Sequence, residues 1–204
     1  MKVYDEQKIK ASDIPTVQFT DDVKALIMFR GLEKDETSLG QTFLEYKKFG
    51  VAINDAAFEP SRAVTRAEYV KMIVRALSCR YTYIGTDSGF PDVSPDAWYA
   101  EYITFGVRNG WMNGYADGDF RPDALITRAE AAKILANAIK LSKSSKNSSF
   151  IDLSNTNTFV PYIEALKDKN IINGTSLTTF DPDRNIPRTE VSRIIYKTFL
   201  GGKR

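Results

Sequence analysis

One motif recurs three times in this chain, and its spacing constrains the fold more than any other feature of the sequence. The copies run over Phe58–Glu68, Phe120–Glu130 and Phe180–Glu190, so they start 62 and 60 residues apart. In each copy a Pro follows the Phe by two positions, an Arg follows it by eight and a Glu by ten. Repeats of this length indicate that each unit buries its apolar surface against neighbouring units.

The second and third units also match outside the motif, because Phe90–Asp92 matches Phe150–Asp152 at an offset of 60. The first unit is irregular. Phe19 lies 31 residues before Gly50, whereas Phe90 lies 20 before Gly110, so the first unit carries about 11 extra residues. We therefore expect an N-terminal extension at 1–18, a first repeat with an insertion at 19–79, and two regular repeats at 90–141 and 150–200. Linkers are expected at 78–89 and 141–149.

Each unit has the pattern of a helix, a loop and a second helix. In the second unit, Ser94 and Pro95 predict a helix start, and Gly110 predicts its end. The second helix then opens with Thr-Arg-Ala-Glu, in which Thr127 and Glu130 have the spacing of a capping box.

The capping box is not equally complete in the three units. The first unit repeats it at Thr65 and Glu68. In the third unit Pro187 stands in place of the Thr, so only Glu190 remains of the box. We expect a second helix at all three positions nevertheless, because helical spacing continues after each motif.

Apolar residues recur after each motif on one predicted helix face. A unit of this size buries too little surface to be stable alone, so the three stripes need one another. The sequence predicts an all-α fold: three tandem helix-loop-helix repeats packed as a pseudo-threefold bundle, with the second helices as a central three-helix core and the first helices outside. The stripes begin Tyr69, Met72 and Ile73; Ala131, Ile134 and Leu135; and Val191, Ile194 and Ile195.

The composition removes several classes of function. The chain has no histidine and one cysteine, which excludes imidazole catalysis, histidine metal sites and intramolecular disulfides. Its 28 Lys and Arg against 26 Asp and Glu give a net charge of +2 without a basic stripe, so no nucleic-acid partner is expected. No segment has the length of a membrane span, and the polar N-terminus has no signal-peptide pattern, so membrane insertion is not expected.

The second unit resembles the S-layer homology (SLH) repeat. The resemblance rests on Phe90-x-Asp92, Trp98, the glycine loop from Gly110 to Pro122 and Ile126–Glu130, with echoes in the other two units. It implies a non-enzymatic module, without cofactor or metal, that anchors a larger bacterial surface protein to the cell wall, outside the cell. The implied ligands are secondary cell-wall polysaccharides, including pyruvylated ones, bound in grooves between repeats.

The resemblance also implies which residues bind the ligand, with the motif arginines as the principal ones. A guanidinium matches a carboxylate with two charge-assisted hydrogen bonds, and a helix N-terminus would add free amides. An arginine in the first helical turn is electrostatically unfavourable unless an anion faces it. Loop glycines permit positive φ, and aromatic faces stack on sugars. The predicted ligand-binding residues are Arg66, Arg128, Arg188, Trp98, Gly114, Tyr115, Asp117 and Gly118.

Other interpretations of these residues were weighed. Phe120 is expected to pack in the core, while Trp98 fits the core and a binding face equally. A calcium loop from Asn113 fails, because Tyr115 and Ala124 occupy positions that need oxygen ligands. Three equivalent glutamates in equivalent repeats do not supply the two unlike carboxylates of a glycosidase. The alternative function is a structural module that makes protein–protein contacts in a surface layer or links an outer membrane to the wall.

Overall fold

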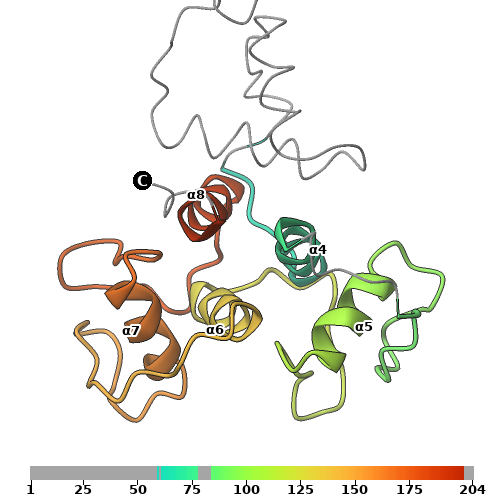
Figure 1. Ribbon diagram of the computed structural model, residues 1–204, viewed down its shortest axis with the longest axis horizontal. Coiled ribbons are helices and arrows are strands. Elements are labelled where there is room, and N and C mark those ends of the chain that lie inside the picture. The colour runs from blue at the N-terminus through green and yellow to red at the C-terminus, as the bar shows by residue number, and fades with distance from the viewer. Residues whose placement is uncertain (1–58, 60, 78–83, 200–204) are drawn as a thin grey trace, which may run out of the picture.

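The computed structural model describes residues 59, 61–77 and 84–199. These residues form five helices and no strand, which confirms the all-α prediction for the described part (Figure 1). The predicted extension at 1–18 and the first helix of repeat 1 lie outside the described residues. None of the described helices is both long and apolar enough to cross a membrane. The helices are α4 Arg66–Ala76, α5 Ala100–Arg108, α6 Arg128–Ala138, α7 Val160–Asp168 and α8 Arg188–Phe199.

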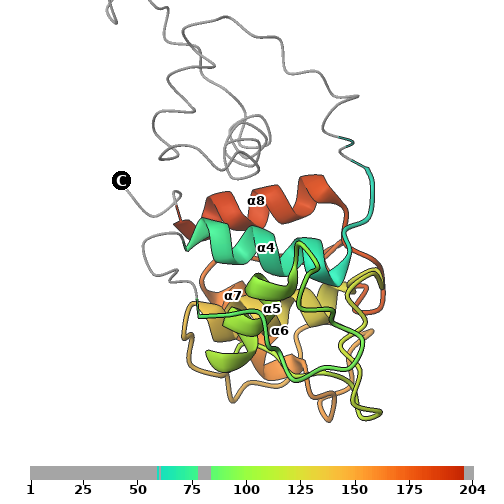
Figure 2. The ribbon, with the colours of Figure 1, turned by 90° about the vertical axis from the view of Figure 1, so that its right-hand side faces the viewer.

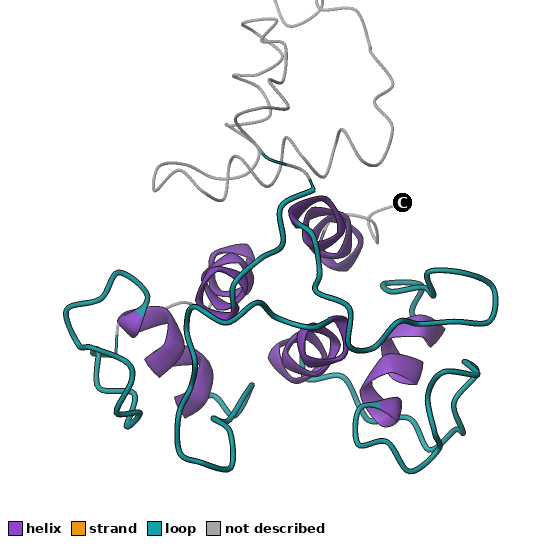
Figure 3. Ribbon diagram, turned by 180° about the vertical axis from the view of Figure 1, so that it is seen from behind, coloured by secondary structure: helices purple, strands orange, loops and turns teal. Residues whose placement is uncertain are grey.

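The second helices of the three repeats gather around one centre. Figures 1 and 3 show α4, α6 and α8 nearly end-on in the middle, with α5 outside α4 and α7 outside α6. Helix α4 contacts α6 and α8, and α4 and α8 lie side by side in Figure 2. The predicted arrangement of inner second helices and outer first helices is therefore confirmed for the described helices.

The first core-facing residue of each inner helix has a side chain of a different size, and this makes the core asymmetric. Tyr69 of α4 is fully buried, as are its counterparts Ala131 of α6 and Val191 of α8. The Tyr69 hydroxyl donates a hydrogen bond of 2.8 Å to the carbonyl of Ala131, which satisfies the buried polar group. Burial raises the pKa of Tyr69 well above its ordinary value. One large and two small side chains thus fill the position between the helices.

A closed ring of backbone hydrogen bonds links the three repeats just before their inner helices. The amide of Val64 donates to the carbonyl of Ile186 at 3.1 Å, Ile126 donates to Val64 at 3.0 Å, and Ile186 donates to Ile126 at 3.1 Å. All three side chains are fully buried. Each repeat therefore depends on both others for hydrogen-bond partners, and the short bridges between these segments are the only β pairing in the described residues.

The inner helices begin under the Phe-x-Pro loop of the next repeat. At the start of α4, the amides of Arg66 and Ala67 donate to the carbonyls of Ala124 and Pro122, both at 2.9 Å. Both halves of the predicted capping box are present, between Thr65 and Glu68 and between Thr127 and Glu130. Helix α6 uses Arg184 and Pro182 in the same way, and the Arg188 amide of α8 donates to Arg62.

The Phe-x-Asp motif stabilises the Phe-x-Pro loop of the same repeat by hydrogen bonds. The Asp92 carboxylate accepts hydrogen bonds from the amides of Phe120 at 2.9 Å and Arg121 at 2.6 Å. Arg121 has a φ of 60°, a strained conformation that these bonds stabilise. The rings of Phe90 and Phe120 lie 5.4 Å apart, and Phe120 is fully buried, as expected of a core residue. In repeat 3, Asp152, Phe150, Phe180 and Asp181 repeat this arrangement.

The predicted start of the first helix at Ser94 is wrong. Helix α5 begins at Ala100, because two successive turns precede it: Ala97 donates to the carbonyl of Ser94, and Ala100 donates to that of Ala97, both at 3.0 Å. The Ser94 hydroxyl accepts a hydrogen bond from the Asp96 amide, which favours a turn over a helix cap. The predicted end is close to correct, since α5 stops at Arg108 and Gly110 has a φ of 70°.

The Asp92 cap predicts a loss of stability on its removal. Asp92→Ala leaves two amides of the strained loop without an acceptor, so we expect the free energy of unfolding to fall by about 2 kcal/mol. Asp96→Ala, an exposed residue in the same loop, is the control and should change it by less than about 0.5 kcal/mol. Urea unfolding of both variants measures this, and equal values would contradict a capping role for Asp92.

Candidate functional site

Two cavities occupy equivalent positions between successive repeats. We name them the 1–2 groove, beside α6, and the 2–3 groove, beside α8. Their volumes are about 170 Å³ and 480 Å³. Both are lined by the arginine of one repeat together with the loop and inner helix of the next. The linings include Arg66, Trp111–Tyr115, Glu130, Lys133 and Ile134 in the first, and Arg128, Ile171–Thr175, Asp181, Arg184, Glu190, Arg193, Ile194 and Lys197 in the second.

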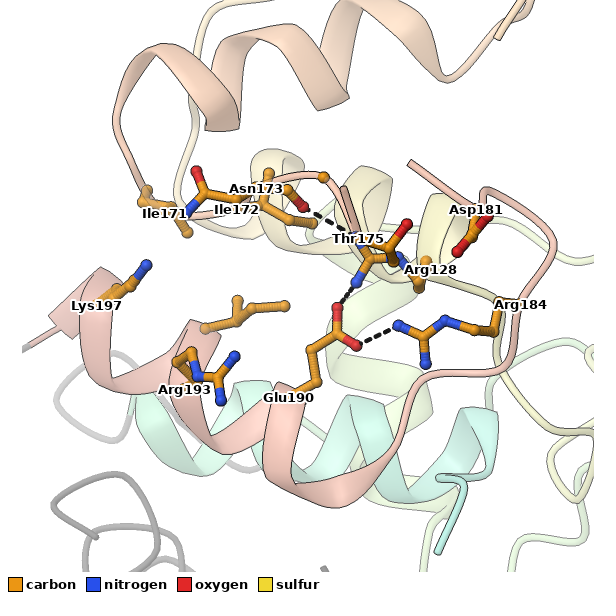
Figure 4. A pocket seen from close by; sticks show the side chains of 12 residues that line it. Arg128, Ile171, Ile172, Asn173, Thr175, Asp181, Arg184, Glu190, Arg193 and Lys197 are labelled. Atoms are coloured by element: carbon orange, nitrogen blue, oxygen red, sulfur yellow. Dashed lines mark hydrogen bonds and ion pairs between the residues drawn. The ribbon is translucent and has the colours of Figure 1, made fainter. Parts of the chain in front are cut away.

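Arg128 lies at the floor of the 2–3 groove and holds repeat 3 in place. Its side chain is only 2% exposed. The guanidinium donates to the carbonyls of Phe180 at 2.8 Å and Asn173 at 2.9 Å, and it forms an ion pair with Glu190 of α8 (Figure 4). Burial, together with the charge of Arg184, lowers the pKa of Arg128 to about 10, so the group stays charged at neutral pH.

Arg66 makes the equivalent contacts in the 1–2 groove. Its Nε donates to the carbonyl of Phe120 at 2.9 Å, and Nη1 donates to Glu130 at 3.2 Å. The guanidinium also lies over the rings of Tyr115 and Phe120, at 4.6 Å and 4.8 Å from their centroids. Arg188 of α8 is likewise buried, and its charge acts on Glu68 of repeat 1.

The predicted free amides at the helix starts are not present in α4 and α6. The amides of Arg66 and Ala67 already bond to the next repeat, and the box supplies an acceptor for Glu68. The unfavourable arginine at the starts of α4 and α6 has an explanation within the chain, because the anion facing it is a glutamate of the next repeat. The sequence predicts a ligand at these helix starts, because it does not show that the next repeat supplies the carbonyls for the amides and the carboxylate for the arginine.

The motif glutamates have a second partner besides the buried arginine, and this partner differs between grooves. Glu130 accepts a 2.6 Å hydrogen bond from the Tyr115 hydroxyl, whose pKa is raised by burial and by this bond. Glu190 instead pairs with Arg184 at 2.7 Å. Because Tyr115 lies over Arg66 and beside Glu130, its ring and hydroxyl narrow the 1–2 groove; its counterpart in the 2–3 groove is the smaller Thr175.

The remaining predicted ligand residues lie in different places. Gly114 lines the 1–2 groove, but it serves packing: an added Cβ would lie 2.4 Å from the Phe90 ring. Gly118 has the expected positive φ, 93°, although neither it nor Asp117 lines a groove. Trp98 is 53% exposed outside both grooves, and Lys71 of α4 lies 5.3 Å from its ring centroid.

Several groove residues were missed because they lie beyond the motif or at positions that its three copies do not share. Arg184 contacts Glu190, and Arg193 and Lys197 line the 2–3 groove. Glu190, Arg193, Ile194 and Lys197 have the spacing of one helix face, a signal present in the sequence that would have indicated a shared surface.

The burial of Arg128 predicts a structural cost on its removal. Arg128→Ala leaves Glu190 and two carbonyls without a buried partner, so we expect a loss of about 3 kcal/mol in the free energy of unfolding. Arg184→Ala is the matched control: it contacts the same carboxylate but is 40% exposed, and should cost less than about 1 kcal/mol. Denaturant titration measures the free energy of unfolding of both variants. A loss of similar size in the two would refute the conclusion that Arg128 holds repeat 3 in place.

Glu68 predicts a pH dependence of stability. Burial acts to raise its pKa, but hydrogen bonds from Arg62 and the Thr65 amide outweigh burial, so the pKa lies below its ordinary value of 4.5. A carboxyl whose pKa falls on folding stabilises the native state above the unfolded value, and this contribution is lost as pH falls through the folded value. Glu68→Gln should therefore flatten the loss of stability between about pH 5 and 3.

Glu59→Gln is the control for this experiment, because Glu59 contacts the same Arg62 from the exposed side. Melting temperatures of the wild type and both variants across that pH range provide the measurement. A Glu68→Gln profile parallel to that of the wild type would contradict the assignment.

Comparison with known proteins identifies the second and third repeats. The model of the S-layer homology domain matches residues 89–132 and 149–191. The chain is 32% identical over 155 residues to the Surface-layer 125 kDa protein of Lysinibacillus sphaericus, and 34% identical over 170 residues to Cell surface glycoprotein 1 of Acetivibrio thermocellus. These alignments cover 73% and 78% of this chain, but only 13% and 7% of the two relatives. The chain belongs to the S-layer homology family of cell-wall-binding modules and is associated with the wall at the bacterial cell surface.

Proposed function

We propose that this module anchors a larger surface protein by binding an acidic cell-wall polysaccharide in the grooves between its repeats. The observation that carries the proposal is the 2–3 groove, an open cavity of about 480 Å³ lined by Arg128, Arg184, Arg193 and Lys197 against two carboxylates. A cavity of this size accommodates sugar units, and its excess of cations favours acidic ones. A relative in Acetivibrio thermocellus, 37% identical over 91 residues, is named a Cellulosome-anchoring protein.

The buried arginines contribute to binding from the groove floor. Arg66 and Arg128 each give part of their hydrogen-bonding capacity to the next repeat, and they keep a positive charge beneath the cavity. Arg188 occupies the equivalent position in repeat 3. In the 2–3 groove Arg184 adds a second guanidinium charge beside the single Glu190 carboxylate, so a ligand carboxylate is attracted there while Glu190 stays paired. Trp98 offers an exposed aromatic face for a sugar ring outside the two grooves. Tyr115 offers its hydroxyl at the 1–2 groove, because the guanidinium groups of Arg66 and Arg121 lie over its ring, and Gly114, Asp117 and Gly118 shape the loop that carries it.

Wall binding tests this proposal. The full chain should sediment with purified bacterial wall sacculi that retain their secondary polymer, and should stay in solution after acid extraction of that polymer. Equal binding to extracted sacculi would refute polymer recognition. Reducing-sugar release from the same sacculi distinguishes binding from hydrolysis.

Trp98 lies outside both grooves, but its 53% exposed side chain offers an aromatic face to a polymer that extends beyond them, so Trp98→Ala should weaken sedimentation without loss of fold. Leu177→Ala is the control, since Leu177 is a 99% exposed apolar residue on another loop. Identical sedimentation of both variants would remove Trp98 from the binding surface.

A second candidate function is a structural assembly module. Ile151 and Leu177 are 81% and 99% exposed, and their loops are joined by the bond from the Ile151 amide to the Thr178 carbonyl. Exposed apolar side chains on adjoining loops favour protein contacts. Light scattering tests this idea: self-association without glycan, lost in Leu177→Ala, would support assembly, and a monomer at all concentrations would exclude self-assembly.

A further inference from the structure

The 2–3 groove has a line of cations that the 1–2 groove lacks. Arg193 and Lys197 follow Glu190 on one face of α8, and all three line the cavity opposite Ile171–Thr175 (Figure 4). With a rise of 1.5 Å per residue, the seven positions from Glu190 to Lys197 span about 10 Å. This length is comparable to that of a disaccharide, so the cations can meet two different sugar units.

Charge at the inner end of the groove is only partly neutralised. Arg128 and Arg184 both contact the Glu190 carboxylate, so two guanidinium charges surround one carboxylate charge. Arg184 is 40% exposed and therefore accessible to a ligand, whereas Arg128 is buried beneath it. Asp181 is the other carboxylate in the lining. The lining as a whole has four cations and two anions. Arg128, Arg184 and both carboxylates lie near the start of α8, whereas Arg193 and Lys197 lie further along the helix.

The 1–2 groove is the natural comparison, because the same scaffold forms it. In repeat 2, Ala124 stands at the position of Arg184, and Asn137 stands at the position of Lys197. The side-chain amide of Asn137 donates to the Trp111 carbonyl. Lys133 is its one rim cation among the lining residues, and Tyr115 narrows it. The two grooves therefore differ in both volume and charge, at positions where the repeats carry different residues.

We infer that the 2–3 groove selects a glycan segment with two negative charges on successive sugar units, one met by Arg184 and the other by Arg193 and Lys197. The inference rests on the proposed function and deepens it, because it specifies the ligand charge pattern and the groove. The inner charge meets a guanidinium that matches a carboxylate geometrically. The outer charge meets two side chains at i and i+4 on α8.

Calorimetry with defined disaccharides tests the inference on the full chain. The probes are one disaccharide with a single pyruvate ketal, the same disaccharide with a ketal on each sugar, and the unmodified form. We expect the wild type to bind the doubly charged probe about tenfold more tightly than the singly charged one. Arg193→Gln/Lys197→Gln should abolish this preference, so that the two charged probes bind this variant with equal affinity.

Lys140→Gln/Lys169→Gln is the control, since it removes the same charge outside both cavities. It should retain the preference, and circular dichroism should show that both double variants are folded. Equal affinity of the wild type for the two charged probes, or an undiminished preference in Arg193→Gln/Lys197→Gln, would overturn the inference while sedimentation with sacculi still supports anchoring. Sedimentation without binding of either charged probe would overturn it as well. Failure of the wild type to sediment would instead remove the proposed function itself.

Discussion

The ring of backbone hydrogen bonds among Val64, Ile126 and Ile186 is the constraint on which the rest of the structure depends. Each amide in the ring finds its acceptor in a different repeat, so no repeat satisfies its own polar groups in this buried position. The ring fixes where each inner helix begins and brings the preceding Phe-x-Pro loop over the neighbouring helix. The grooves follow from this geometry, because each motif arginine then extends under the loop of the next repeat.

The Thr-Arg-Ala-Glu motif serves the fold before it serves any ligand. Its Thr and Glu cap their own helix, while the Arg bonds to the following repeat and the Glu receives the Arg of the preceding one. A buried charge is tolerated here because carbonyls and a carboxylate satisfy its donors. The same arrangement places an arginine–glutamate ion pair at the floor of each described groove, so one side chain both joins the repeats and shapes the groove.

The sequence alone predicts what is local or periodic. The all-α class, both capping boxes, the buried Phe120 and the inner position of the second helices follow from helical spacing and cap chemistry. The start of α5 and the state of the helix amides do not, because both depend on competing partners: the Ser94 turn within the loop, and carbonyls such as Ala124 from another repeat. Lys197 could not be found in this way, since a search for repeated motifs discards positions that differ between repeats. Arg193 has basic counterparts in Lys71 and Lys133, but this position lies beyond the Phe-to-Glu motif.

Those differing positions are where the grooves acquire separate chemistry. Residues shared by the repeats form the ring, the caps and the Phe-x-Asp support, so substitution there disturbs the scaffold. Tyr115 and Thr175 occupy matching sites on the rims of the two grooves, where a change alters volume without breaking those bonds. Lys197 lines the 2–3 groove, whereas its counterpart Asn137 does not line the 1–2 groove. A symmetric scaffold with unlike rims therefore lets one chain present grooves of different volume and charge. The unequal volumes and charges of the two described grooves follow from these differences between corresponding residues of the repeats.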